Sequence, residues 1–105
     1  MEWGHVYVVR SGSRYKIGYT TGSVRQRVSS IQVGCPGKMI LVCAIPVREP
    51  KKTEAGIHQF FADRRTRGEW YALTGHDVKN LKAEERIARK EYALWQLQRA
   101  ITPKW

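Results

Sequence analysis

The sequence predicts an α+β fold, in which a small three-stranded antiparallel sheet is flanked by helices and followed by a long C-terminal helix. Three observations predict it. Two short β-rich segments, 5–10 and 14–19, flank a polar loop that contains glycine, which is the pattern of a β-hairpin. The apolar, β-branched segment 39–47 predicts a third strand, which we place at the centre of the sheet. Apolar residues at helical spacing predict that the segments between and after the strands are helices.

The first helix is expected directly after the hairpin, from Ser23 to about Gln32. Serine is a favoured N-cap residue, because its hydroxyl accepts a hydrogen bond from a free backbone N–H of the first turn. Val24, Val28 and Ile31 then recur on one side of the helix and form its buried face.

A second helix is expected over residues 52–64, where apolar residues again recur at helical spacing. Glu54 and His58 lie four residues apart in it, so they share one face. This face combines a carboxylate with an imidazole, and no other acidic residue is expected on it.

A basic loop at 64–68 and a short extended segment at 69–73 lead into the last helix, expected at 77–101. We expect residues 1–76 to form the main domain and residues 77–105 to form a helical extension packed on the same domain.

Composition restricts the possible classes of protein. The 105 residues suffice for one small domain, and 19 Lys and Arg against 9 Asp and Glu give a net charge of +10. Such a charge favours a polyanionic partner, most simply nucleic acid. No apolar run spans a bilayer and no signal peptide is visible, so we expect a cytoplasmic protein, or one in the host cytoplasm if viral, without membrane association. Cys35 and Cys43 do not form a disulfide framework.

Tyrosine, lysine, arginine and glutamate in this order are a suitable set for cutting a phosphodiester. The reaction needs a base for water, positive charge on the phosphate and stabilisation of the leaving oxygen. Tyr7 is the candidate base, and a cation such as Lys16 on the neighbouring strand is expected to lower its pKa. Glu54 is the candidate ligand of a single Mg²⁺, with Mn²⁺ as the alternative ion.

Several motifs in sequence order carry a family resemblance. They are Val6-Tyr7, Lys16-Ile17-Gly18, Ile31-Gln32-Val33-Gly34-Cys35-Pro36, Glu54 with His58, and Gly68-Glu69-Trp70-Tyr71. Together they resemble the GIY-YIG nuclease superfamily, and most closely its phage-associated branch. The resemblance covers roughly residues 5 to 74.

The resemblance implies a GIY-YIG-like sheet and a Mg²⁺-dependent DNA endonuclease. It implies that Tyr7 is the base or a relay to water, and that Lys16, in place of the commoner tyrosine, holds the phosphate. Arg27 matches the helical arginine of the family, but one extra residue before the helix keeps Arg25 as an alternative. Glu54 matches the metal-binding carboxylate, and His58 is a second base, a phosphate contact or a structural partner.

DNA, single- or double-stranded, is the expected partner, with no separate cofactor beyond the metal. The residues expected to grip its backbone are Arg25, Arg64, Arg65, Arg67, Lys79 and Lys82. Two alternatives remain open. In the first, the chain is a weakly active or inactive nucleic-acid-binding module. In the second, it is an interaction protein that uses its last helix to bind a partner or to form a homodimer.

Overall fold

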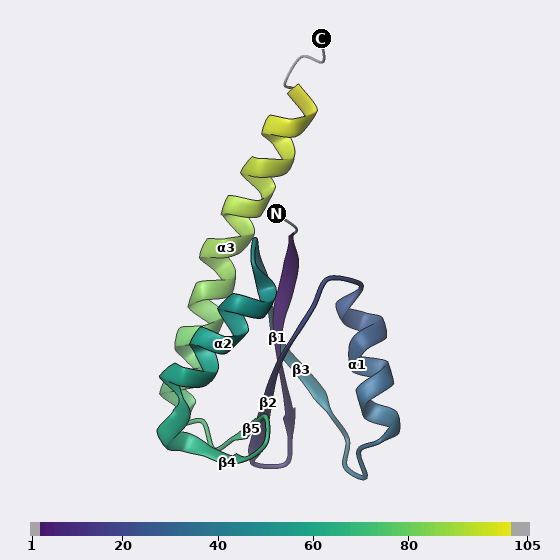
Figure 1. Cartoon of the computed structure of the whole chain (residues 1–105), viewed down its shortest axis with the longest axis vertical. Helices are drawn as coiled ribbons and strands as arrows, with labels where there is room; N and C mark the ends of the chain where they lie inside the picture. Colours follow the sequence, from purple (N-terminus) through teal and green to yellow (C-terminus); the bar gives the residue numbers. More distant parts are fainter. Residues whose placement is uncertain (1–2, 102–105) are drawn as a thin grey trace.

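The computed structural model describes residues 3–101 and has the predicted α+β architecture, including the long last helix (Figure 1). The elements in chain order are β1 (Gly4–Ser11), β2 (Arg14–Thr20), α1 (Val24–Val33), β3 (Ile40–Val47), α2 (Pro50–Phe60), a 3₁₀ turn (Ala62–Arg64), β4 (Arg65–Arg67), β5 (Trp70–Tyr71) and α3 (Gly75–Ile101).

The sheet has five strands in the order β3-β1-β2-β5-β4, and every neighbouring pair is antiparallel. The prediction of three strands is therefore wrong. The two additional strands, β4 and β5, are only three and two residues long, so they are too short to show an alternating pattern. They are strands because their backbones pair with each other and with β2.

The prediction that segment 39–47 is the central strand is also wrong, because β3 lies at one edge and β2 lies at the centre. Its apolar character reflects burial against the rest of the fold, since Cys43, Ala44 and Ile45 are almost fully covered. An edge position also explains how β3 tolerates Pro46, which has no N–H to donate to a ladder.

The sheet is covered on both faces, and successive residues of β1 alternate between them. Val6 and Val8 point toward the side of α2 and α3, where they join the larger core. Tyr7 and Val9 point toward α1 and pack with its apolar side chains. This alternation, which is the rule for a β-strand, places Tyr7 on the α1 face.

The ends of the first two helices follow from local chemistry. The Ser23 hydroxyl accepts a hydrogen bond from the Gln26 N–H at 3.2 Å, which confirms the predicted N-cap of α1. The second helix begins earlier than expected, because Pro50 occupies its first turn, where a missing N–H costs nothing. It also ends earlier, at Phe60, and continues as the 3₁₀ turn.

The last helix begins with a reciprocal cap. The Thr74 hydroxyl accepts from the Asp77 N–H at 3.1 Å, while the Asp77 carboxylate accepts from the Thr74 N–H at 2.9 Å. Asp77 is 6% exposed and pairs with the Arg64 guanidinium at 3.1 Å. From this anchor α3 runs along the sheet and projects past its end (Figure 1), so that the molecule extends 51 × 28 × 19 Å.

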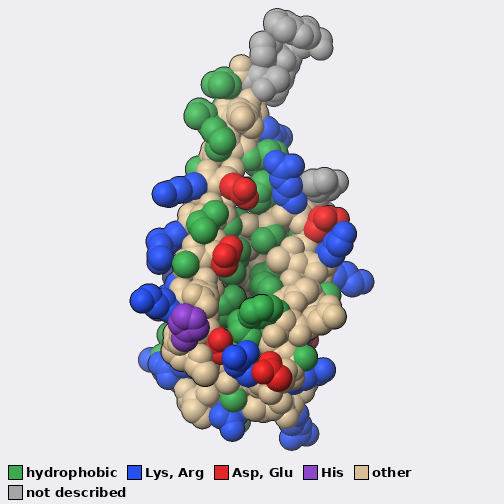
Figure 2. Space-filling model, turned by 90° about the vertical axis from the view of Figure 1, so that its left-hand side faces the viewer, with side chains coloured by type: hydrophobic (Ala, Val, Ile, Leu, Met, Phe, Trp, Pro, Cys, Tyr) green, Lys and Arg blue, Asp and Glu red, His purple; other side chains and the backbone are tan. Residues whose placement is uncertain are grey.

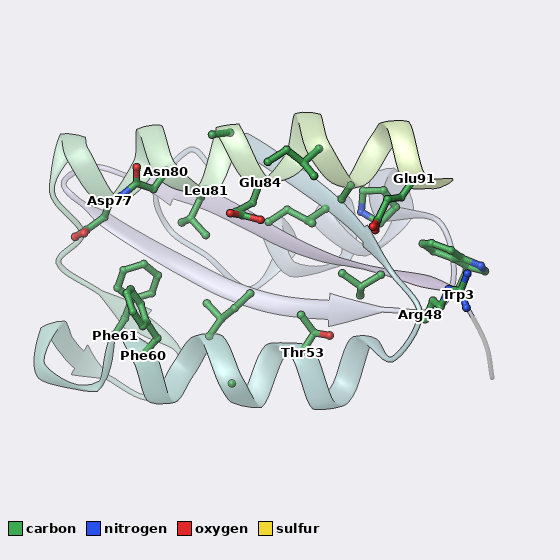
Figure 3. A pocket seen from close by; sticks show the side chains of 18 residues that line it. Trp3, Arg48, Thr53, Phe60, Phe61, Asp77, Asn80, Leu81, Glu84 and Glu91 are labelled. Carbon is green, nitrogen blue, oxygen red and sulfur yellow. The ribbon is translucent and has the colours of Figure 1, made fainter. Parts of the chain in front are cut away.

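A groove of about 950 Å³ lies between α2 and α3 (Figure 3). Its walls are largely apolar and include Ile57 of α2 and Leu81 of α3, with Phe60 and Phe61 at one end. It lies on the face of the sheet opposite Tyr7.

Both cysteines are free thiols, as the absence of a disulfide framework predicted. Cys43 is 2% exposed, and burial raises the pKa of its thiol to about 12, which leaves it protonated and unreactive. Among residues 3–101, no helix is long and apolar enough to cross a membrane.

Candidate nuclease site

Tyr7 and Gly18 face each other across β1 and β2. A Cβ atom added at Gly18 would lie 2.5 Å from Cζ of Tyr7 and closer still to its hydroxyl. The tyrosine ring therefore lies across the position where any other residue would have a side chain. Glycine in the Lys-Ile-Gly motif is explained by this contact, because it lets the buried ring reach from β1 over the central strand.

The Arg27 guanidinium of α1 lies close to the Tyr7 hydroxyl, where it favours the phenolate form. Arg25 has no such interaction, because it projects from the other side of the apolar stripe of α1. Of the two arginines left open by the sequence, Arg27 is therefore the one next to the tyrosine, and it remains exposed to solvent.

The pKa of Tyr7 is raised, chiefly by burial, while the Arg27 guanidinium opposes the rise. The expectation of a lowered pKa is wrong in direction. Tyr7 is only 1% exposed, and the loss of hydration destabilises its phenolate more than one neighbouring cation stabilises it. The cation that favours its phenolate form is Arg27 rather than Lys16.

The edge of β2 beyond the short strand β5 is covered by α2. β5 pairs only with Tyr15 and Lys16, so the next residues of β2 have no strand neighbour on that side. There Nε2 of His58 lies 2.9 Å from the Ile17 carbonyl oxygen. Because a carbonyl only accepts, Nε2 carries a proton and donates it to this oxygen.

Glu54, His58 and Glu69 gather at this edge. Each offers one ligand atom, and these three atoms all lie within 4.8 Å of one another. Burial raises the pKa of Glu54 first; the nearby His58 lowers it and the Glu69 carboxylate raises it. Two carboxylates and an imidazole whose other nitrogen is fixed by a carbonyl are a suitable donor set for a divalent metal ion.

Lys16 of β2 lies next to this cluster. Its Nζ lies 3.6 Å from Glu69 Oε1 and 5.9 Å from the ring centre of Trp70. The lysine side chain is 20% exposed and thus reaches solvent. It supplies positive charge next to the carboxylates, and the ion pair and the tryptophan fix where that charge lies.

The basic residues expected to contact DNA are spread over different parts of the surface, as the blue side chains in Figure 2 illustrate for one face. Arg67 pairs with Trp70, so it shares the face of Tyr7, whereas Arg65 pairs with Tyr71. Lys79 and Lys82 belong to α3, which covers the opposite face. Arg64 is engaged with the buried Asp77 carboxylate, which gives it a structural role.

One site residue was undervalued by sequence reasoning. Glu69 appeared in the sequence analysis only as part of the Gly68-Glu69-Trp70-Tyr71 motif, without a role at the site, yet it lies within reach of both Glu54 and Lys16. Its position depends on the pairing of β5 with β2, and a strand of two residues is too short to be predicted from the sequence. The helical spacing of Glu54 and His58, by contrast, was visible in the sequence, and the structure confirms that they lie together.

A family model described as the T5orf172 domain matches residues 4–94. This is a phage-associated, nuclease-like family, so the match agrees with the phage-associated branch to which the motifs point. Comparison with curated proteins and with solved structures found no match. The matched residues include every member of the site just described and most of α3.

Proposed function

Because the chain belongs to the T5orf172 domain family, we propose that it is a metal-dependent DNA endonuclease of GIY-YIG type. One observation carries the proposal: a tyrosine, two cations, two carboxylates and a histidine from five separate elements or loops converge at the free edge of β2. These residues are Tyr7, Lys16, Arg27, Glu54, His58 and Glu69.

Glu54, His58 and Glu69 are the proposed metal ligands. Mg²⁺ prefers oxygen donors, and an imidazole in the set also suits Mn²⁺. A divalent ion held by these three residues would supply positive charge near the leaving 3′ oxygen of the cut strand. The hydrogen bond from His58 Nε2 to the Ile17 carbonyl holds the ring, so Nδ1 is the nitrogen that would bind the ion.

Arg27 and Lys16 are the proposed phosphate contacts. The Arg27 guanidinium is exposed and lies next to the tyrosine hydroxyl, so it can bind two oxygens of a phosphate placed beside that hydroxyl. Lys16 adds a point charge on the other side of the site. Both stabilise the charge that develops on the phosphorus oxygens as water attacks.

Tyr7 is the proposed acceptor of the proton from the attacking water. Its raised pKa keeps it neutral near pH 7, so only a small fraction is phenolate at any moment. A base of high pKa is strong when it is deprotonated, and Arg27 stabilises that form. His58 is not the first choice as the base, because its Nδ1 is the proposed metal ligand.

The test is cleavage of supercoiled plasmid and of single-stranded DNA with Mg²⁺, with Mn²⁺ and with EDTA. Wild-type protein is expected to cut with metal only, and Glu54→Gln is expected to lower the rate by about 10³ or more, a loss of the size seen when electrostatic stabilisation of a transition state is removed. Glu49→Gln is the matched control, because Glu49 is an exposed glutamate next to the first turn of the same helix.

A second candidate function is favoured by one observation. Tyr7 is almost fully buried with a raised pKa, which suits a site that binds a phosphate better than it activates water. The chain would then be a nucleic-acid-binding module without turnover. A gel shift of DNA by the wild type and by Glu54→Gln, with no cleavage by either protein under any metal condition, would support this candidate and contradict the first.

A further inference from the structure

The last helix carries a row of large apolar side chains that nothing among the described residues covers. Ile87, Leu94, Leu97 and Ile101 are 58%, 55%, 56% and 69% exposed. Figure 2 shows such hydrophobic side chains along the part of α3 that projects past the sheet. Contiguous exposed apolar surface of this kind marks a site of association.

This row is not the face that holds α3 on the domain. The opposite side of the same helix makes those contacts: the ring centres of Tyr92 and Trp95 lie 4.8 and 5.2 Å from that of Trp3. Leu81 and Ala88 continue this inner side into the main core. The helix is therefore already anchored by one face, and the exposed row is a second face.

The exposed row has the spacing of a coiled coil. Ile87, Leu94 and Ile101 are seven residues apart, and Leu97 lies three residues after Leu94. In heptad notation the first three are a positions and Leu97 is a d position. Apolar residues repeated every 3.5 residues form the seam between two helices that supercoil around each other. Lys90 fills the remaining d position, where its methylene stem can cover the seam while its ammonium group reaches solvent.

We propose that this face binds α3 of a second copy of the chain, in parallel and in register, as a two-stranded coiled coil. Charge favours this partner. In a parallel pair, each g residue faces the e residue of the partner's next heptad. This places Arg86 opposite the partner's Glu91 and Lys79 opposite the partner's Glu84, and the twofold axis repeats both pairs.

An antiparallel pair lacks this complementarity. It would place g residues against g residues, which here are basic or alanine, and e residues against e residues, which here are glutamate or glutamine. The a position one heptad before the exposed row is Asn80, which also lines the groove between α2 and α3. A single asparagine at an a position specifies register in parallel two-stranded coils. Charge and this asparagine therefore both favour the parallel arrangement.

The geometry of the domain permits the arrangement. The apolar row lies largely on the side of α3 opposite Leu81, Tyr92 and Trp95, although Ile87 also lines the groove between α2 and α3. A second helix on this row would therefore lie beside that groove and not over the sheet. The catalytic cluster at the edge of β2 contributes no residue to this pairing, so the inference is independent of the proposed nuclease activity.

Sedimentation equilibrium of the full chain tests the proposal. A subunit has a mass of 12.1 kDa, and the wild type is expected to have twice that mass at about 100 µM and to dissociate on dilution. Leu94→Glu is expected to be monomeric with unchanged helix content by circular dichroism. Gln96→Glu, at an exposed position on another side of the same helix, is the control and should remain dimeric. A monomeric wild type, or a dimer unaffected by Leu94→Glu, would overturn the proposal.

A charge reversal tests the pairing without touching the apolar row. Arg86→Glu should weaken the dimer, because it places two glutamates opposite each other, and Arg86→Glu with Glu91→Arg should restore it. Orientation is tested in a Cys35→Ser background with Ile87→Cys and, separately, Leu97→Cys. Only a parallel, in-register pair brings each new cysteine close enough to its own copy to form a disulfide. Failure of both cysteines to cross-link, or no rescue by the double reversal, would contradict the parallel arrangement.

Discussion

At the scale of single residues, the contact between Tyr7 and Gly18 decides where the site is. Gly18→Ala would place a methyl group where the tyrosine ring lies, so the ring or β2 must move. We expect a loss of about 1–3 kcal/mol in the free energy of unfolding, which is the usual cost of overpacking, together with loss of cleavage. Urea denaturation measures the first effect.

The control for that substitution is Gly56→Ala in α2, where a Cβ atom meets nothing within 4 Å. It is expected to raise stability by about 0.5–1 kcal/mol, because alanine loses less backbone entropy in a helix than glycine does. Equal stability of Gly18→Ala and wild type would mean that the tyrosine ring does not lie over β2.

The pKa of Tyr7 predicts how cleavage depends on pH. The pKa of Tyr7 is raised above the ordinary value of 10.0, so the phenolate fraction grows with pH throughout the neutral range. We expect the cleavage rate to rise with pH and to level off only above about pH 10. Tyr7→Phe should lower the rate by about 10² to 10⁴ and abolish this rise while DNA is still bound. A rate independent of pH between 7 and 9 would exclude Tyr7 as the base.

At the scale of elements, the link between Arg64 and Asp77 joins the turn after α2 to the start of α3. Asp77 also caps that helix, so the pair is part of the fold. Arg64→Ala is expected to lower the free energy of unfolding by about 2 kcal/mol, in the range for hydrogen bonds to charged groups. Arg67→Ala, at an exposed position in β4, should leave stability within about 0.5 kcal/mol of wild type. Chemical denaturation of the two variants makes the comparison.

A comparison of the predicted with the observed helices and strands shows which parts of this fold can be predicted from the sequence. The hairpin, the Ser23 cap and the helical faces were predicted correctly, because each depends on a local pattern of alternation, capping or helical spacing. The rank of β3 in the sheet and the existence of β4 and β5 depend on pairing between distant segments. The sequence of a buried edge strand such as β3 resembles that of a central strand, because the pattern of apolar residues depends on burial and not on the number of neighbouring strands.

The same distinction applies to the site. Glu54 and His58 could be paired from the sequence, since four residues of helix separate them. Glu69 could not be added to them, because it reaches the site only through the two-residue pairing of β5 with β2. The pKa of Tyr7 was mispredicted for a related reason: burial depends on the whole fold, and here it outweighs the charge of a single neighbour.

At the scale of the whole molecule, a net charge of +10 predicts DNA affinity that falls steeply with salt. Each phosphate contact contributes about −0.7 to −0.9 to the slope of log K against log salt concentration. Arg67→Ala should reduce this slope by about one contact, because Arg67 shares the face of Tyr7. Lys79→Ala and Lys82→Ala should leave it unchanged, because α3 covers the other face. Fluorescence anisotropy at several salt concentrations measures the slopes.

The central claim is that Glu54, His58 and Glu69 together hold one divalent metal ion. Titration of DNA-free protein with Mn²⁺, followed by electron paramagnetic resonance of the free ion, tests it most directly. We expect one ion bound per chain, affinity that falls as acid protonates Glu54, and affinity weakened about 10-fold or more in Glu54→Gln and in Glu69→Gln but unchanged in Glu49→Gln. No binding by the wild type, or equal binding by wild type and Glu54→Gln, would contradict the account.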